Sequence, residues 1–292
     1  MTHPYADSRY ASAFMPAYEP LLMPSVGLHV LKRPIPGSDL YDAMGPYPLS
    51  PLRADADLEA DFDHLRAQGI VSLVLVSDPF FHPSHESLAG AFDTAALFKE
   101  HYIYDFAQPQ PFSSHHRYEI RRAAPACDVR VIDLAEHMDA WYALYAQLIE
   151  KHHITGIQAF TRSYFEQLCA LDPIVVGAFS AGKLVSAHIW LMHEGYVYSH
   201  LAASSDEGYK LRAAYVVYDY SITHFTQLGA HKLDFGAGAG VNETSQGLTF
   251  LKKGFSTGRV PCYLCCKILD EVSYAALSRG KASAFFPAYR GA

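Results

Sequence analysis

Residues 173–204 read PIVVGAFSAGKLVSAHIWLMHEGYVYSHLAAS, and the positions of the turn-forming segments in this stretch decide the fold class. The short segments SAGK and HEG divide it into apolar, alternating runs at the positions where hairpin turns are expected. We therefore expect an antiparallel meander. The surrounding patterns predict helices at 137–154, 161–171 and 211–229, and a strand at 231–236. This order predicts an α+β fold, in which helices pack on a mixed sheet, and not a series of βαβ units.

The first part of the chain is rich in proline and tyrosine and has a less regular pattern. An amphipathic helix is expected at 56–69, with Gly69 as its C-cap, and a buried strand follows in IVSLVLVSD. QPQPFSSHH, residues 108–116, has the composition of a linker, so we expect two domains, 1–108 and 109–292. The other expected segments are a strand at 25–35, an extended loop at 39–52, a helix leading to a strand at 87–106, a helix leading to a strand at 119–134, and a strand at 259–269 with more strand in the tail.

Composition excludes several classes of protein. A net charge of −7 over 292 residues argues against a general nucleic-acid coat, which needs a basic surface. The sequence contains no run of about 18 apolar residues, and MTHPYADSRY lacks the order of a signal peptide, so we expect a cytoplasmic protein without membrane insertion. Five cysteines fit a reduced compartment. Cys262, Cys265 and Cys266 alternate with apolar residues in an expected strand, which favours core packing over a metal site.

The glycine-rich stretch LDFGAGAGVNETSQGLTFLKKGF, residues 233–255, invites comparison with phosphate-binding loops. A dinucleotide fingerprint needs a glycine where Val241 stands, and a Walker loop needs serine or threonine after its lysine. Neither pattern is present. The stretch is therefore interpreted as a turn after a strand, whose glycines either let the backbone approach a ligand or simply bend the chain.

Several segments in a fixed order resemble a known family. They are RYEIRRA at 117–123, the meander, a helix ending in LG, the strand LDFG at 233–236, and GLTFLKKGF at 247–255. This order resembles the FemABX-like branch of the GNAT acyltransferase superfamily over roughly residues 110–270. Residues 20–105 look like the degenerate first GNAT-like half of that family. The resemblance implies two GNAT-like halves and transfer of an acyl or aminoacyl group onto an amine.

Such a transfer must remove a proton from the amine and stabilise an oxyanion. Lys252 matches the family's lysine before the G-F pair, where its ammonium could hold the oxyanion or a donor phosphate; the alternative is a surface lysine near a strand end. Asp234 could orient the amine, act as a base, or accept hydrogen bonds from the loop. His200, on one strand face with Tyr198, is either a base or a hydrogen-bonded sheet histidine.

Other positions are candidates for substrate and donor binding. Arg117 and Arg121 would share a helical face and could bind phosphate or carboxylate, or only begin a solvated helix. Tyr198 is expected to contact substrate, and Tyr41, in the proline-rich loop, could line an acceptor pocket. The donor-binding candidates are Gly236, Gly238, Lys253 and Arg212.

The identity of the donor depends on SDEGYKLRAA, residues 205–214. CoA-dependent GNAT enzymes usually carry a glycine-rich loop here, whereas this segment has one glycine and an acidic pair. The resemblance then implies aminoacyl-tRNA as donor, with its acceptor stem on Lys252, Lys253, Arg259 and Lys267. The acceptor would be a small amine-bearing metabolite, a peptide or a cell-envelope precursor. An acyl-CoA-dependent N-acetyltransferase and a non-catalytic binding module are the alternatives. We expect no resident cofactor, because the donor is a cosubstrate, and no metal.

Overall fold

The computed structural model describes residues 2–238, 246–281 and 285–291. The chain divides into two compact units. The first contains residues 1–99 and 261–292, and the second contains residues 100–260. The expected boundary at 108/109 therefore differs from this division, and the C-terminal residues return to the first unit. The described helices include none that is both long enough and apolar enough to span a membrane.

The first unit is built on the strand order β1-β2-β3-β4-β11. Neighbouring strands are antiparallel except for β3 and β4, which run parallel. Its strands are β1 (Glu19–Met23), β2 (Leu28–Pro34), β3 (Tyr41–Met44), β4 (Ile70–Val76) and β11 (Gly258–Ile268), which begins in the second unit. Its helices are η1 (Pro4–Ala6), α1 (Ser8–Ser12), α2 (Leu58–Ala67), α3 (His85–Ala91), α10 (Glu271–Ser278) and η5 (Ala288–Arg290).

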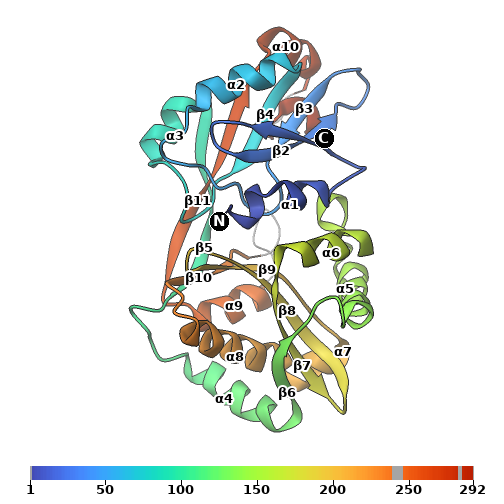
Figure 1. Cartoon of the computed structure of the whole chain (residues 1–292), viewed down its shortest axis with the longest axis vertical. Helices are drawn as coiled ribbons and strands as arrows, with labels where there is room; N and C mark the ends of the chain where they lie inside the picture. The colour runs from blue at the N-terminus through green and yellow to red at the C-terminus, as the bar shows by residue number, and fades with distance from the viewer. Residues whose placement is uncertain (1, 239–245, 282–284, 292) are drawn as a thin grey trace. The chain divides into compact units, whose positions relative to one another are not determined.

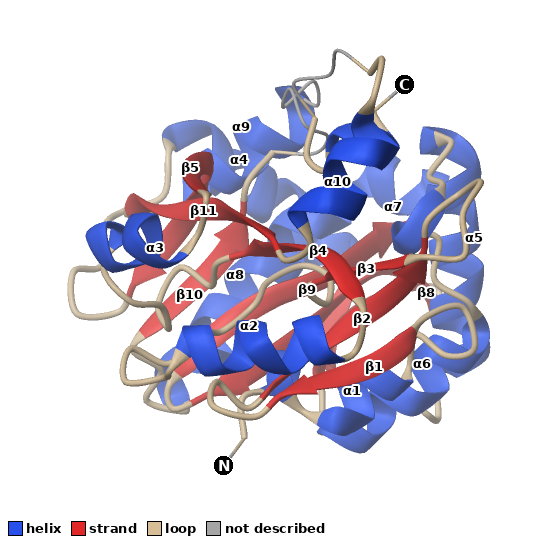
Figure 2. Cartoon of the chain, turned by 90° about the horizontal axis from the view of Figure 1, so that it is seen from above, coloured by secondary structure: helices blue, strands red, loops and turns tan. Residues whose placement is uncertain are grey.

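Helix α2 shows how the sequence specifies an element of this unit. The side chain of Asp57 accepts a hydrogen bond from the Ala60 N–H at 3.0 Å and so caps the first turn. Gly69 has a φ of +72°, a value that favours glycine, and turns the chain into β4. The helix packs against β1 and β4 (Figure 2) and buries Phe62 and Leu65 in the core of the unit.

The second unit has the strand order β5-β10-β9-β8-β7-β6. Only β9 and β10 run parallel, so the sheet is mixed, as predicted. Its strands are β5 (Thr94–Asp105, from the first unit), β6 (Asp128–Ile132), β7 (Ile174–Ser180), β8 (Lys183–His193), β9 (Tyr196–Ser204) and β10 (Lys232–Gly236). Its helices are α4 (Ser114–Ala123), η2 (Ala124–Ala126), α5 (Met138–His152), η3 (Gly156–Gln158), α6 (Arg162–Leu168), η4 (Cys169–Leu171), α7 (Asp206–Leu211), α8 (Ala213–Gln227) and α9 (Gln246–Phe255).

The predicted meander is β7, β8 and β9. Both of its turns use two consecutive residues with positive φ, Ala181 and Gly182 in one and Glu194 and Gly195 in the other, as tight hairpins require. Helix α8 packs against β7 and β8, and α4 contacts both α8 and α9, so α4, α8 and α9 form one group (Figure 1). Helix α5 packs against β8 and β9, and α6 adjoins it.

Three expectations about elements were wrong. The loop expected at 39–52 contains β3, the loop expected after β10 contains α9, and the tail folds into α10 instead of strand. Residues 239–245 of the glycine-rich stretch lie outside the described residues. The three clustered cysteines, Cys262, Cys265 and Cys266, are buried in β11, as core packing requires. Within the described ranges, no three His, Cys, Asp or Glu side chains are grouped to hold a metal ion.

Candidate active site

The central feature of the second unit is a fork between two parallel strands. β10 pairs with β9 only from Lys232 to Asp234, opposite Tyr196 to Tyr198, while β9 continues to Ser204. β10 then bends at Gly236, where its register with β5 shifts. Beyond Tyr198, therefore, no strand among the described residues pairs with this edge of β9 in the place of β10. Backbone groups of β9 are left for other partners, such as an extended ligand.

A cavity of about 1120 Å³ adjoins the part of β9 that continues beyond its pairing with β10. Ala202, Ala203 and Ser204 of β9 line it, together with residues of β8, the end of α5, the junction of α7 and α8, and α9. Its described lining contains lysine, arginine and histidine but neither aspartate nor glutamate. These basic residues are Lys151, Arg212, His115, His152, His153 and His188. The cavity is therefore suited to a ligand that carries negative charge.

The N-terminus of α8 contributes to this positive character. Arg212 precedes the helix with a φ of +60°, and its side chain makes no capping hydrogen bond. Its Nε lies 3.8 Å from Oε2 of the buried Glu119, which holds the guanidinium at the cavity wall. Ala214 and Tyr215, in the first turn of α8, also line the cavity. A helix N-terminus presents backbone N–H groups and a partial positive charge, so an anion would be stabilised here.

His188, on β8, lies in the cavity wall and was not predicted as a site residue. Its side chain is almost fully buried and stacks on Trp190, with ring centroids 3.7 Å apart. Nε2 lies 2.8 Å from the Ser199 hydroxyl, whereas Nδ1 has no hydrogen-bond partner within the described structure. Burial, with a further contribution from the positive charge of Lys252, lowers the pKa of His188 well below its usual value. The imidazole is therefore neutral.

Lys252 lies on α9 and is buried, with 8% of the residue exposed. Its ammonium donates a hydrogen bond to the Ala237 carbonyl oxygen at 2.5 Å. A side chain at Gly236 would lie 3.2 Å from Nζ, so this glycine lets the lysine reach the fork. Lys252 is therefore not a surface lysine and adds no charge to an exposed basic patch. Its catalytic role stays a prediction.

Asp234 lies at the end of the paired part of β10 and is buried. Its carboxylate accepts a hydrogen bond from the backbone N–H of Gly236 at 2.6 Å and lies 2.9 and 3.0 Å from Nδ1 of His101. The hydrogen-bond acceptor expected for the glycine turn is therefore present. His101 was not predicted, because 133 residues separate it from Asp234 and no local pattern marks the pair.

His200 and Tyr198 are both buried in β9. Nε2 of His200 lies 2.8 Å from the Tyr164 hydroxyl, and burial lowers the pKa of His200 to about 3. β9 has one extra residue relative to β8 at this position, since Ile189 pairs with Leu201 and Trp190 with Ser199. Neither His200 nor Tyr198 lines the cavity. The bond to Tyr164 and the low pKa of His200 fit the hydrogen-bonded sheet histidine better than a base that works near neutral pH.

Helix α4 is held against α9 by His116, another residue that was not predicted. Nε2 of His116 lies 2.9 Å from the Leu251 carbonyl oxygen, and Nδ1 lies 2.8 Å from the Ser113 hydroxyl. The ring occupies the space beside Gly254, where an added Cβ would lie 2.0 Å from it. This close approach explains the glycine of the G-F pair. It also fixes the helix that carries Lys252.

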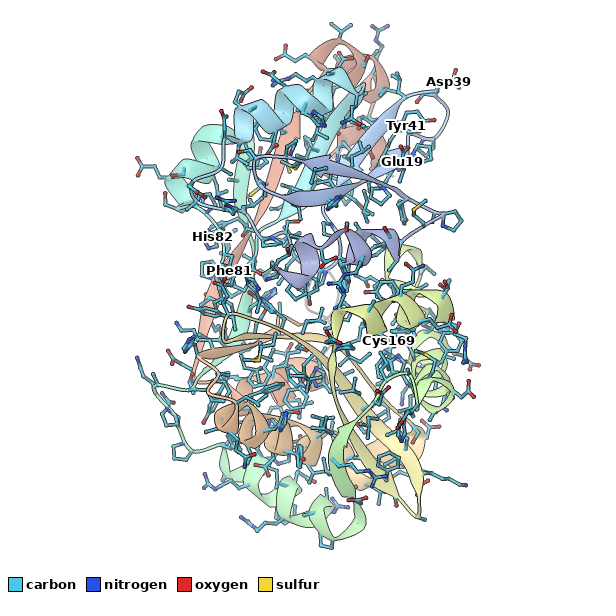
Figure 3. All side chains as sticks on the ribbon, viewed as in Figure 1. Glu19, Asp39, Tyr41, Phe81, His82 and Cys169 are labelled. Carbon is cyan, nitrogen blue, oxygen red and sulfur yellow. The ribbon has the colours of Figure 1, made fainter. Side chains whose placement is uncertain are left out.

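The other predicted binding residues are dispersed. Arg117 and Arg121 are exposed on α4, where Arg117 donates to the Phe112 carbonyl, and neither lines the cavity. Lys253 is exposed on α9, and Gly238 is buried after β10. Tyr41 lies on β3 of the first unit (Figure 3), where Lys32 contacts its ring. Of the predicted positions, Arg212 lines the cavity. Asp234 and Lys252 each adjoin Gly236 at the fork.

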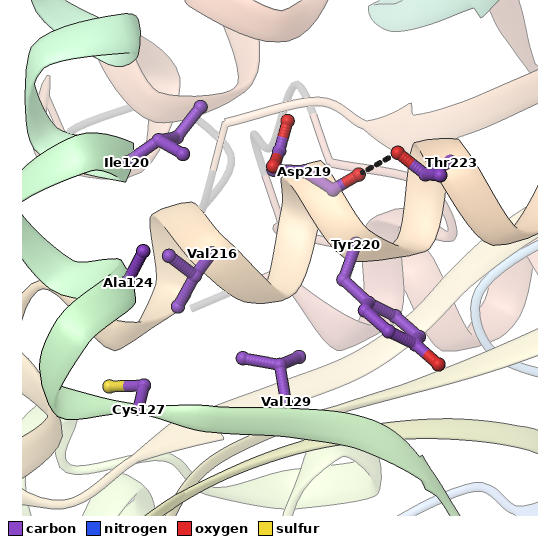
Figure 4. A pocket seen from close by; sticks show the side chains of 8 residues that line it. All are labelled: Ile120, Ala124, Cys127, Val129, Val216, Asp219, Tyr220 and Thr223. Atoms are coloured by element: carbon purple, nitrogen blue, oxygen red, sulfur yellow. Dashed lines mark hydrogen bonds between the residues drawn. The ribbon is translucent and has the colours of Figure 1, made fainter.

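A second, smaller cavity of about 240 Å³ lies between α4, β6 and α8 (Figure 4). Apolar side chains form most of its wall, and Asp219 lies at one side, where burial raises the pKa of its carboxyl group. Thr223 donates its hydroxyl proton to the Asp219 carbonyl oxygen within α8. This cavity shares no lining residue with the larger one.

Comparison with known proteins agrees with this geometry. Residues 112–242 match the family model described as an Acetyltransferase (GNAT) domain. The chain is similar in structure to FemX, with 12% identity, coverage of 94% of this chain and 95% of that chain, and a TM-score of 0.68. It is also similar to L-PGS from Bacillus licheniformis, with 12% identity, coverage of 91% and 94%, and a TM-score of 0.61. Among curated proteins, none matches the chain in sequence.

A further similar structure is the C-terminal DUF2156 domain of a lysylphosphatidylglycerol synthetase candidate from Agrobacterium fabrum. It is 15% identical, with coverage of 91% of this chain and 89% of that chain, and a TM-score of 0.63. These findings confirm the GNAT-like α+β fold and the resemblance to the FemABX-like branch. They support a GNAT-type acyltransferase. The degenerate first half stays a prediction.

Proposed function

We propose that this chain, which has the fold of FemX and matches a GNAT domain over residues 112–242, moves an aminoacyl group from aminoacyl-tRNA to an amine. One observation carries the proposal. The buried ammonium of Lys252 lies at the fork between β9 and β10, beside a cavity whose described lining is basic. Leu251, the neighbour of Lys252 in α9, lines this cavity, whereas Lys252 itself does not. A fixed cation beside a cavity suited to anions would stabilise the oxyanion of acyl transfer from a phosphate-bearing donor.

The geometry suggests how the donor lies. Its phosphate would rest against Arg212 and the N-terminus of α8, and the rest of the donor would follow β9 toward the fork, along the edge that β10 leaves after Asp234. From Ala202 to Tyr198 this path is about 13 Å long, at roughly 3.3 Å per residue. The acyl carbonyl would then lie near Lys252. Its ammonium would stabilise the oxyanion that forms when the amine attacks.

The segment before α8 supports aminoacyl-tRNA over acyl-CoA. Asp206–Leu211 forms the short helix α7 instead of a glycine-rich loop. Its only glycine, Gly208, packs against β8, because an added Cβ would lie 2.1 Å from the Val185 carbonyl oxygen. In addition, the lysylphosphatidylglycerol synthetase candidate from Agrobacterium fabrum is named for an aminoacylated product. The acceptor in our proposal is a small amine-bearing metabolite, a peptide or a cell-envelope precursor, and the reaction takes place in the cytoplasm, where aminoacyl-tRNA is made.

The deciding experiment is a transfer assay with two donors in parallel. Purified protein receives either pooled tRNA charged with radiolabelled amino acids or radiolabelled acetyl-CoA, together with a panel of amines and peptides. We expect label to leave the tRNA and enter an amine product, and the K252M variant to lose this transfer. Label moving only from acetyl-CoA would support the alternative donor. If the protein binds either donor without any transfer, the binding-module alternative would replace our proposal.

A further inference from the structure

His101 and Asp234 form a buried pair whose geometry resembles an acid-oriented catalytic base. Nδ1 of His101 lies 2.9 and 3.0 Å from the two carboxylate oxygens of Asp234. A carboxylate only accepts hydrogen bonds, so the proton of this contact resides on Nδ1. The lone pair of the neutral ring is then on Nε2. This tautomer is the one in which an imidazole can take a proton from a substrate.

The pair is fixed in position by its surroundings. Asp234 also accepts the backbone N–H of Gly236 at 2.6 Å, so both its own strand and β5 hold the carboxylate. His101 is not sealed into the core, because 11% of its side chain surface remains exposed. Among the described residues, no hydrogen bond involves its Nε2. An oriented ring with an unused nitrogen is what a base needs before substrate binds.

The location links the pair to the proposed reaction centre. Asp234 is the last residue of β10 that pairs with β9, so the pair lies at the fork. Gly236, which donates to Asp234, is also the glycine that adjoins the ammonium of Lys252. The same turn therefore adjoins both groups, through the Gly236 N–H on Asp234 and the position of Gly236 beside the Lys252 ammonium. Lys252 is a cation suited to an oxyanion, and His101 is an imidazole whose Nε2 is placed to accept a proton when the ring is neutral.

We propose that His101 is the general base of the transfer and that Asp234 is the positioning residue that fixes its tautomer. This inference rests on the proposed function. The neutral amine nitrogen attacks the acyl carbon, a C–N bond forms, and one amine proton passes to Nε2. When the tetrahedral intermediate collapses, the bond from carbon to the ester oxygen of the donor breaks, and the imidazolium returns the proton to that oxygen. Protons and charges balance without another reactant.

The other buried histidines of the unit are less suited to this role. Burial lowers the pKa of His188 and of His200, the latter to about 3, so neither ring takes up a proton readily near neutral pH. His200 also has its Nε2 engaged by the Tyr164 hydroxyl. His116 has both ring nitrogens engaged, Nε2 by the Leu251 carbonyl oxygen of α9 and Nδ1 by the hydroxyl of Ser113, the N-cap of α4. His101 combines an acidic partner with an unused nitrogen at the fork.

The first test compares H101Q with the matched variant H193Q. As whole residues, His193 and His101 are each 9% exposed, and His193 also lies in a strand of the second unit, but the reaction does not use it. We expect H101Q to lower kcat at least 100-fold with KM changed less than threefold, and H193Q to stay within threefold of the native enzyme. An H101Q variant that retains more than a third of the native kcat would overturn the proposal. Circular dichroism and Tm verify that both variants are folded.

Rescue separates a base from a merely structural residue. In H101A, added imidazole should restore at least a tenth of the native kcat in a saturable way, because the small base can occupy the empty space. D234N should lower kcat about 10²-fold or more while KM is unchanged, because an amide that donates to Nδ1 moves the ring proton to Nε2. Failure of both effects in folded variants would show that the pair is only structural.

A reactivity measurement tests the pair even if neither donor supports transfer, and so distinguishes the two proposals. Diethyl pyrocarbonate acylates neutral, accessible imidazole nitrogens, and peptide mass spectrometry locates the products. We expect His101 to react faster than His116, His188 and His200, and to react at least fivefold more slowly in D234N. An unreactive His101 would overturn its assignment as a base, whatever the donor. A reactive His101 in a protein without transfer would leave the dyad supported and the proposed function refuted.

Discussion

At the scale of single residues, a substitution at Lys252 can distinguish the effect of its charge from the effect of its shape. Methionine has nearly the length of lysine but no charge, so K252M should keep the packing of α9 and lose the interaction with an oxyanion. We expect kcat to fall about 10²- to 10³-fold, the size of effect that removal of one oxyanion-stabilising group produces. The buried Ala237 carbonyl also loses its donor, which costs about 1–3 kcal/mol of stability. Transfer assays and thermal unfolding measure the two effects separately.

Arg212 permits an unusual control because of its backbone. Its φ of +60° suits glycine, so R212G removes the guanidinium without backbone strain, whereas R212A keeps a strained conformation. If the guanidinium binds donor phosphate, both variants should raise the KM for donor about tenfold or more, with R212A less stable than R212G. Equal KM values in native protein and R212G would contradict the placement of the donor phosphate.

At the scale of elements, the contact between α4 and α9 depends on two glycines of α9 that differ in their surroundings. An added Cβ at Gly254 would lie 2.0 Å from the His116 ring, but at Gly247 it would meet nothing within 4 Å. G254A should therefore displace His116 and lower the free energy of unfolding by about 1–3 kcal/mol. G247A should be neutral or stabilise the helix by up to about 1 kcal/mol. Urea unfolding of both variants tests this difference.

The same elements show what local pattern can predict. The meander and α6 were predictable because SAGK, HEG and Thr161 are strong local signals, and the Thr161 side chain indeed accepts the Tyr164 N–H. Helix α9 was missed because it contains two glycines and follows a stretch typical of a loop. Strand β3 was missed because its neighbours are rich in proline and glycine, and its pairing with β2 and β4 depends on residues elsewhere in the chain.

In the candidate site, too, some features could be predicted from local sequence and others required the folded structure. The resemblance pointed to Lys252 and Asp234, but burial, orientation and partners required the fold. His101 and His188 become candidates only through contacts with residues distant in sequence or through the cavity itself. Conversely, the exposed arginines of α4 looked favourable by helical spacing, and nothing local indicated that they lie outside the cavity lining.

At the scale of the whole molecule, buried histidines make stability depend on pH. Folding lowers the pKa of His188 and of His200 below the ordinary value near 6.5. Below about pH 6.5, therefore, these two histidines bind protons in the unfolded chain but remain neutral in the folded chain. Their stabilising contribution is fully present above that pH and is lost as the pH falls, in the case of His200 toward about 3. Each such histidine can lower the free energy of unfolding by up to about 1.4 kcal/mol per pH unit.

We expect H200Q, whose amide can still bond to the Tyr164 hydroxyl, to show a shallower fall in stability between pH 6.5 and 4.5 than the native protein. Denaturant unfolding at a series of pH values measures this slope. H152Q is the control, because His152 is exposed and its replacement should leave the slope unchanged. Identical slopes in H200Q and the native protein would mean that folding does not lower the pKa of His200.

The division of the chain has a consequence for its synthesis on the ribosome. Residues 100–260 form one continuous unit, but the first unit needs β11, whose Leu264 pairs with Val76 of β4. During synthesis, therefore, all residues of the second unit have been made before those of the first unit are complete. Until β11 emerges, the edge of β4 that it will occupy lacks this partner, and an unpaired strand edge is prone to pair with other chains. The N-terminal residues are synthesised first, but the unit that they form can finish folding only after β11 has been made. During that time the nascent chain depends on whatever keeps the exposed edge of β4 from pairing with other chains.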